Sequence, residues 1–337
     1  VLSCFNFGPH TVNPLWPWLG MKKNKSEVNT KHKAKNPGCL FLVPILLAVV
    51  IFLSLLIPIS KAQAQNSEVL VSPSGSVSFT QINKSGIRAS VIKADLGNPN
   101  IKVKPVLAWD RVGRVEPVYS IASRHPGTVV ATNAGFFDVD KTNLPIGMIM
   151  IDGTITAWNM GPWNRASLIF DSNNRADVFH PKQKMKLKLF IHGNESNWLY
   201  IHGINRYRSK NEAIIYIRKG YGHKTQTNHW GMEIIVEDNV VTGIIEEKGN
   251  SEIPENGYVI SLHGASRINY GHLFKVGDKL NLVTGLPENT WQAIMGGPEL
   301  IRNHQKCIDL QAEGFGRDIA SPNDRIGIGL TDENKIL

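Results

Sequence analysis

The residues best suited to chemistry in this 337-residue chain lie close together in the sequence: Asn133, Gly135, Phe136 and Phe137. An apolar, β-branched run from Val129 precedes them, which predicts a buried strand that ends at a polar turn. Asn133 and Gly135 tolerate backbone conformations that other residues avoid, so the turn can bring main-chain amides and the Asn133 amide close to a ligand. The two phenylalanines would wall this site, or else fill the core as aromatic residues usually do.

Two carboxylates accompany such turns. Asp138 directly follows the phenylalanines and is the first candidate for activating water or stabilising a cation. The alternative is that Asp138 caps a turn or binds a structural cation such as calcium. Glu299 follows a Gly-Gly-Pro turn at 296–298 and could face the same pocket, with a solvated turn residue as the alternative.

Several segments follow in an order that resembles the phosphodiester glycosidase family. That family includes the enzyme that uncovers mannose 6-phosphate by removing N-acetylglucosamine, and bacterial proteins linked to exopolysaccharide. The segment N-A-G-F-F is similar to the family's N-G-G-F-F, with alanine in place of the first glycine. The other similar segments are P-I-G at 145–147, I-D-G at 151–153, N-R-Y-R at 205–208, I-I-Y at 214–216, I-P-E-N-G-Y-V-I-S at 253–261, M-G-G-P-E-L at 295–300 and N-D-R-I-G-I-G at 323–329.

This resemblance implies a hydrolase that cleaves a sugar from a glycosyl phosphodiester of the N-acetylglucosamine-1-phosphodiester type. Such a reaction requires stabilisation of an oxocarbenium-like transition state and of the departing negative charge. An arginine fork binds two phosphate oxygens, and Arg206 and Arg325 lie in matching segments, with a surface arginine as the alternative for each. The implied catalytic residues are Asp138 and Arg325, and the implied substrate-binding residues are Asn133, Gly135, Phe136, Phe137, Arg206, Gly296 and Gly297.

One departure from the family bears on catalysis. In the family, a D-G-G-G-S-like turn follows the R-T-A-I-G strand and contributes to the active site. No such sequence occurs in these 337 residues. The sequence therefore predicts a phosphodiester glycosidase-like domain at 86–337 that is incomplete at its C-terminus, and a carbohydrate- or phosphate-binding module without catalysis is the alternative.

Other reaction classes lack their usual motifs. The histidines do not form His-x-x-x-His on a helix, so a zinc site is not expected. There is no Gly-x-Ser-x-Gly elbow and no phosphate-binding Gly-x-x-x-x-Gly-Lys-Ser/Thr loop. We expect no cofactor, with a divalent cation such as calcium as the one alternative, and a glycan or sugar phosphodiester as the partner.

The positive charge of the chain is concentrated in its N-terminal part. Residues 1–64 hold seven lysines and one glutamate, whereas the rest carries 30 basic and 27 acidic residues, which does not favour nucleic-acid binding. A basic region from Met21, an apolar stretch at 39–59 and A-Q-A at 62–64 form the layout of a secretory signal. An uncleaved membrane anchor is the alternative, because about 20 apolar residues span a bilayer. Either predicts export to the envelope, periplasm or exterior.

The elements that must position these residues are predicted to be short strands. We expect an α+β fold, a β-rich single domain with mixed sheets. It would follow a possible over-extended start at 1–20, the signal or anchor at 21–64 and a linker at 65–85. Alternation of apolar residues predicts strands at 86–96 and 100–106, and E-D-N at 237–239 predicts a hairpin turn. The other predicted strands lie at 166–170, 185–191, 213–217, 232–236, 240–246, 258–262 and 279–283, with a short helical turn at 119–124.

Overall fold

The computed structural model describes residues 2–3, 67–70, 75–159, 164–181, 186–191 and 196–337. The chain divides into two compact units, and every site discussed below belongs to the first. The first unit comprises Val1–Pro9, Glu68–Thr80 and Ser90–Leu337, and the second comprises His10–Ser67 and Gln81–Ala89. The predicted signal or anchor at 21–64 lies outside the described residues. Among those residues, the helices are too short or too polar to span a bilayer.

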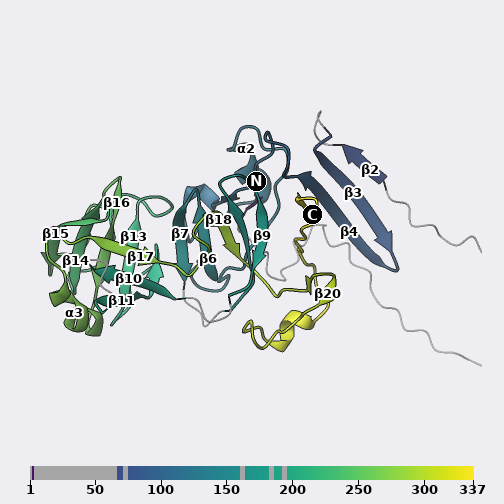
Figure 1. The fold of residues 1–337 in the computed structure, drawn as a ribbon. Helices are drawn as coiled ribbons and strands as arrows, with labels where there is room; N and C mark the ends of the chain where they lie inside the picture. Colours follow the sequence, from purple (N-terminus) through teal and green to yellow (C-terminus); the bar gives the residue numbers. More distant parts are fainter. Residues whose placement is uncertain (1, 4–66, 71–74, 160–163, 182–185, 192–195) are drawn as a thin grey trace, which may run out of the picture. The chain divides into compact units, whose positions relative to one another are not determined.

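The widest sheet in the described part of the chain has ten strands, in the order β15, β14, β16, β13, β12, β7, β6, β18, β8 and β9 (Figure 1). In chain order these are β6 (Gly147–Ile151), β7 (Thr154–Asn159), β8 (Ser167–Asp171), β9 (Ala176–Phe179), β12 (Gly203–Ile204), β13 (Ala213–Ile217), β14 (Met232–Glu237), β15 (Val240–Glu246), β16 (Gly257–Leu262) and β18 (Thr290–Met295). The pairs are antiparallel except β12 with β13, which is parallel, so the sheet is mixed.

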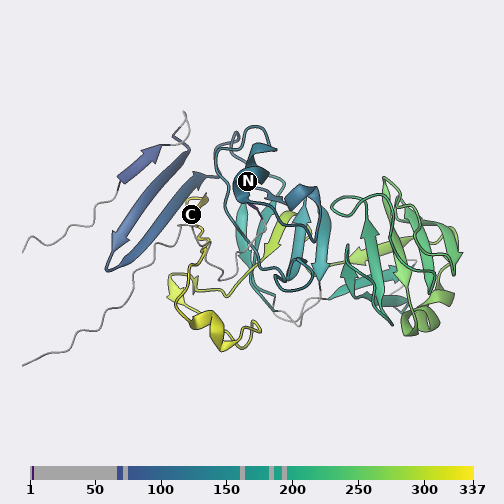
Figure 2. The same cartoon turned by 180° about the vertical axis from the view of Figure 1, so that it is seen from behind.

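A second sheet packs against one half of the first. It is built from β10 (Leu187–Ile191), β11 (Trp198–Ile201) and β17 (Leu280–Val283), with β10 in the middle. Leu187, Leu189 and Ile191 alternate along β10 and are fully buried in one core with Ile234 and Ile260 of the wide sheet. The alternation of buried and half-buried residues in β10 is the pattern of a strand with one face in a core. Figure 2 shows the same strands from behind.

The remaining elements are short. A further sheet has the order β2 (Ser67–Leu70), β3 (Val77–Lys84), β4 (Ile87–Asp95) and β21 (Lys335–Ile336). Two small pairs are β1 (Leu2–Ser3) with β5 (Pro105–Val106), and β19 (Ile301–Arg302) with β20 (Gln305–Lys306). The helices are η1 (Ala108–Asp110), α2 (Val118–Ser123), α3 (Ala265–Tyr270), η2 (Gly271–Leu273) and η3 (Arg317–Ala320).

The structure confirms the prediction of a β-rich fold with mixed sheets. The predicted turn at 237–239 joins β14 to β15, with Glu237 paired to Val240. The two residues between them, Asp238 and Asn239, have φ angles of +47° and +62°. Two consecutive positive φ angles are those of a type I′ hairpin turn, which Asp and Asn tolerate.

Three local predictions were wrong. Residues 128–136, all of which are described, form no regular strand, and Val129 is half exposed. Likewise, only 105–106 of the predicted strand at 100–106 is a strand. The predicted linker at 65–85 contains β2 and β3. The common reason is that extended, β-branched sequence becomes a strand only where a partner supplies a hydrogen-bond ladder, which local sequence does not reveal.

Candidate functional site

Three strand ends of the wide sheet meet at one edge. Strand β18 runs antiparallel to both of its neighbours, β6 and β8, so its C-terminal end lies beside their N-terminal ends. Met295 at the end of β18 pairs with Ser167 at the start of β8. The next amide, that of Gly296, donates a 3.0 Å hydrogen bond to the carbonyl of Ala166. The loops at 133–146, 164–166 and 296–299 are therefore gathered at this edge.

Two glycines let the 133–146 loop approach β18 closely. A β-carbon on Gly135 would lie 2.7 Å from the carbonyl oxygen of Met295. Gly147 has φ +112°, and a β-carbon there would lie 2.6 Å from the Met295 sulfur. Neither position has room for a side chain, so the glycines bring the N-A-G-F-F segment against the end of β18.

An arginine that the sequence did not single out lies beside two aromatic rings. The guanidinium carbon of Arg165 is 4.1 Å from the ring centroid of Phe315 and 5.5 Å from that of Phe136. The two rings are themselves 5.6 Å apart. Burial lowers the pKa of Arg165, whereas the nearby Glu313 carboxylate raises it. Because an arginine stays protonated in proteins, the structure places a buried cation next to a pair of aromatic rings.

A buried carboxylate joins the loops. Glu313 is 1% exposed and accepts hydrogen bonds from the amides of Ala166, at 2.9 Å, and Glu299, at 2.7 Å. Gly297 has φ +84°, and a β-carbon there would lie 2.3 Å from Glu313 Oε2. We call this assembly the glycine-loop cluster. It consists of Asn133, Gly135, Phe136, Arg165, Gly297, Glu313 and Phe315.

Three buried polar atoms in the segments of this edge lack a hydrogen-bond partner among the residues that the structure describes. They are Oδ1 of Asn133, Oδ1 of Asn164 and Oγ of Ser167. A buried acceptor without a donor costs about 1–3 kcal/mol. Such atoms are usually paired, so a donor from a bound molecule would suit them.

The other predicted residues of these loops have different surroundings. Gly296 lies at the edge, and a β-carbon there would meet open space. Phe137 packs instead with Val106 and Ile121 in a small core. Asp138 accepts hydrogen bonds from the amide and hydroxyl of Thr142, at 3.1 and 2.7 Å, and the hydroxyl bond is the main cause that lowers its pKa. Asp138 therefore caps its own turn, which the sequence analysis held open.

The two arginines that were predicted to bind phosphate form hydrogen bonds outside the glycine-loop cluster. Arg206 binds Glu212 through two hydrogen bonds of 2.9 and 2.8 Å. Burial acts to raise the pKa of Glu212, but hydrogen bonds from Arg206 and Ser209 outweigh it, so the pKa is lowered. Arg325 is exposed and donates to the carbonyls of Ile319, Ser321 and Asp324 in its own loop. The predicted phosphate-binding roles of both arginines stay predictions.

A second buried carboxylate lies just beyond Gly297. Glu299 is not solvated as its turn position suggested: it is 7% exposed, and it contacts His180 Nδ1 at 2.9 Å and Arg302 Nε at 2.7 Å. Sequence reasoning missed Arg165, His180, Glu313 and Phe315, because each lies in a segment distant from the motif and only the fold brings them together.

Within the described part of the chain, no group of three or more His, Cys, Asp or Glu side chains is arranged to hold a metal ion. The expectation of no cofactor, and the calcium alternative, stay predictions.

The chain is similar to two solved structures. No family model matches it, and no curated protein does. A hypothetical protein from Synechocystis is 19% identical over 77% of this chain, with a TM-score of 0.60. A protein from Burkholderia pseudomallei described as a putative exported protein is 16% identical over 77% of this chain, with a TM-score of 0.49. This chain spans about half the length of the first, 50%, and 61% of the second. The first likeness indicates a shared fold.

Proposed function

We propose that this protein binds and hydrolyses a glycosyl phosphodiester, of the N-acetylglucosamine-1-phosphodiester type, at the glycine-loop cluster. The observation that carries the proposal is the position of Arg165. A buried guanidinium lies 5.5 Å from the ring of Phe136, inside the segment that resembles the phosphodiester glycosidases. Gly135 and Gly297 from two other matching positions pack at the same strand ends. The N-A-G-F-F and M-G-G-P-E-L segments, both similar to the family, thus lie at one edge of the sheet.

The chemistry of the cluster suits this substrate. The departing phosphate carries negative charge, and a cation held in surroundings of low dielectric stabilises such charge more strongly than one in water. Arg165 is held in place by the carbonyls of Glu313 and Gly314, at 3.2 and 3.4 Å. The unpaired Oδ1 atoms of Asn133 and Asn164 would accept hydrogen bonds from sugar hydroxyls.

Binding without hydrolysis is the second candidate function, and a specific observation favours it. Asp138 is committed to its own turn, and both carboxylate oxygens of Glu313 accept backbone hydrogen bonds. In this state neither carboxylate is placed as a general base. The cluster could therefore recognise a sugar phosphate without cleaving it.

The proposal includes export. The substrate is expected in exopolysaccharide or cell-envelope glycan, and the N-terminal layout is that of a secretory signal or a membrane anchor. Sequencing the N-terminus of the exported protein tests this directly. A start near Gln65 supports cleavage, an intact N-terminus in the membrane fraction supports an anchor, and retention in the cytoplasm contradicts the proposal.

The decisive experiment measures free N-acetylglucosamine released by the full chain from the methyl phosphodiester of N-acetylglucosamine 1-phosphate. Calorimetric binding of the same compound is measured in parallel. Arg165→Lys keeps the charge but loses the planar fork, so we expect at least a tenfold fall in kcat/KM. Arg175→Lys is the matched control, because Arg175 is exposed in the turn after β8. Its kcat/KM should equal that of the unaltered protein.

The outcomes separate the two candidates. Release that falls in Arg165→Lys and not in Arg175→Lys supports hydrolysis at the cluster. Binding without release, weakened by Arg165→Lys, supports the binding function. Neither release nor binding, in a protein with a cooperative thermal melt, refutes both.

A further inference from the structure

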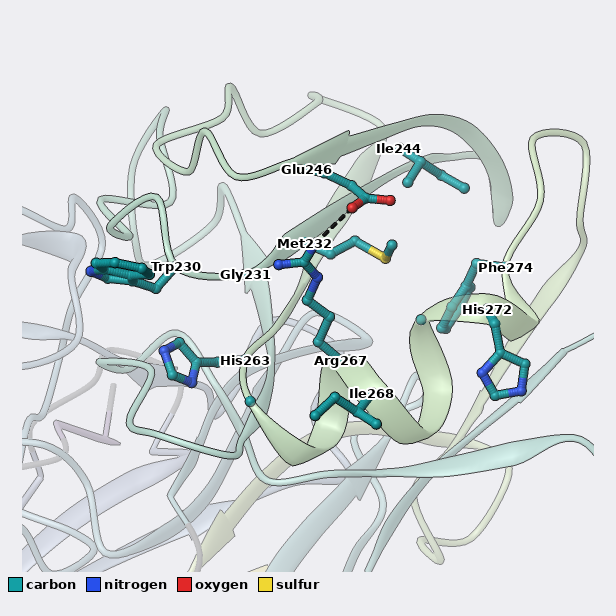
Figure 3. A pocket seen from close by; sticks show the side chains of 12 residues that line it. Trp230, Gly231, Met232, Ile244, Glu246, His263, Arg267, Ile268, His272 and Phe274 are labelled. Atoms are coloured by element: carbon teal, nitrogen blue, oxygen red, sulfur yellow. Dashed lines mark hydrogen bonds and ion pairs between the residues drawn. The ribbon is translucent and has the colours of Figure 1, made fainter.

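A pocket lies far along the sheet from the glycine-loop cluster. Strands β14 and β15, the loop before β14 and helices α3 and η2 surround a pocket of about 750 Å³. Five strands of the wide sheet separate β14 from β18, which leads to the cluster. Figure 3 shows Trp230 and His263 at one end, Arg267 in the middle, and Ile244, His272 and Phe274 at the other.

Trp230 presents an exposed ring on a rigid backbone. Its side chain is 63% exposed, and its ring lies 4.3 Å from that of His229. Its carbonyl accepts a 2.7 Å hydrogen bond from Arg208, and its amide donates to Asn228 Oδ1 at 3.2 Å. A β-carbon on the next residue, Gly231, would lie 2.4 Å from the carbonyl of Leu262, so glycine is required there. The backbone that carries this exposed indole is thus held in place at the pocket.

Buried polar side chains hold the loop that carries Trp230. Arg208 is 5% exposed and also donates to Ser261 Oγ at 2.7 Å. Behind it, the Glu233 carboxylate accepts from Thr227, Ser251 and Ser261 at 2.6 to 3.0 Å. Burial acts to raise the pKa of Glu233, but these hydrogen bonds outweigh it and lower the pKa. The carboxylate is therefore ionised and holds the loop at neutral pH.

The arginine of the pocket is already neutralised. Arg267 donates to Glu246 at 2.6 Å and to Glu247 at 3.2 Å, and the first of these pairs is drawn in Figure 3. A phosphate or carboxylate would have to compete with two carboxylates for this guanidinium. The pocket is accordingly a poor site for an anion, because its guanidinium group already donates to carboxylates.

His263 adds a neutral hydrogen-bonding group. Burial is the largest cause that lowers the pKa of His263, and Arg208 and Lys210 lower it further. Its Nδ1 accepts the amide hydrogen of Asn211 at 3.4 Å, so the neutral ring carries its proton on Nε2. The floor is apolar, with buried Met232 and Phe274.

We propose that this pocket binds one neutral sugar unit of a glycan chain. The exposed face of Trp230 stacks on the apolar C–H face of the sugar ring, and Glu246, Arg267 and His263 bind its hydroxyl groups. An apolar wall with a few convergent polar side chains is the usual composition of a small-molecule site. Neither phosphate recognition nor hydrolysis is involved, so this inference stands apart from the proposed function.

The test is ligand-observed saturation-transfer NMR on the full chain, with chitotetraose and cellotetraose as neutral probes and N-acetylglucosamine 1-phosphate as the anionic probe. We expect saturable binding of at least one neutral probe, weakened at least tenfold by Trp230→Ala. Trp291→Ala is the matched control, because Trp291 is a partly exposed tryptophan on β18 outside the pocket. His263→Ala should also weaken binding, and thermal melts identify any variant that has not folded.

Three results would overturn the inference. They are the absence of binding by either neutral probe, equal binding by Trp230→Ala and the unaltered protein, and stronger binding of the anionic probe that depends on Trp230. Self-association that Trp230→Ala abolishes, without sugar binding, would identify the surface as a contact between copies instead. Arg165→Lys should leave neutral-sugar binding unchanged, so failure of the proposed function at the cluster can be told from failure of this inference.

Discussion

Replacing Gly297 with alanine should destabilise the protein, whereas the same change at Gly296 should not. Gly297 has φ +84°, and its β-carbon would lie 2.3 Å from Glu313 Oε2. At Gly296, φ is not in the left-handed region, and the β-carbon would meet no atom within 4 Å. The two neighbouring glycines thus form a matched pair that differs in conformation and space.

Two effects should lower the free energy of unfolding of Gly297→Ala. A residue other than glycine in the left-handed region costs roughly 1–2 kcal/mol. The Glu313 carboxylate could move away from the new methyl group only by giving up its 2.9 Å bond to the Ala166 amide. A hydrogen bond to a charged group contributes roughly 1.5–3 kcal/mol. Together, Gly297→Ala should lower the free energy of unfolding by roughly 2.5–5 kcal/mol.

Thermal unfolding followed by circular dichroism measures this difference. For a domain of this size, 1 kcal/mol shifts Tm by about 2–4 °C, so Gly297→Ala should melt about 10 °C lower. Gly296→Ala should melt within about 2 °C of the unaltered protein. Equal melting temperatures for the two variants would refute the reasoning, because they would show that Glu313 does not hold Gly297 in the described geometry.

Three further variants test other assignments. Arg206→Gln should cost about 2 kcal/mol in chemical denaturation, because it leaves the half-buried Glu212 without its charged partner, and should leave sugar-phosphate affinity unchanged; a loss of affinity at equal stability would restore its predicted binding role. Arg325→Ala should change stability by less than about 0.5 kcal/mol, since this exposed side chain contacts only its own loop, and a fall in sugar release would instead support its predicted catalytic role. Glu116 has its pKa lowered from 4.5 to about 2, first by its hydrogen bond from Arg124, so its contribution to stability is complete above pH 4.5 and is lost as the pH falls toward 2. Glu116→Gln should therefore show a smaller fall in Tm than the unaltered protein between those pH values, and parallel profiles would contradict the assignment.

Local sequence predicted the elements that are specified by their own residues. The turn at Asp238 and Asn239 needs two positive φ angles, and both residue types accept them, so its hairpin could be placed from the sequence. Strand β13 could also be placed from the sequence, since its predicted bounds of 213–217 are those observed. In contrast, the run at Val129 had the composition of a strand and became an irregular segment, because strand formation depends on a partner elsewhere in the chain.

The sequence by itself indicated that Gly135, Phe136 and Gly297 belong to turns, because glycine adopts backbone conformations that other residues avoid and proline fixes φ. Only the tertiary structure decided which charged groups accompany them. It placed Arg165 beside the rings of Phe136 and Phe315 and Glu313 next to Gly297, and it paired Arg206 with Glu212. The physical reason is that a charge finds its partner through burial and distance in space, whereas a turn is specified by the residues that form it.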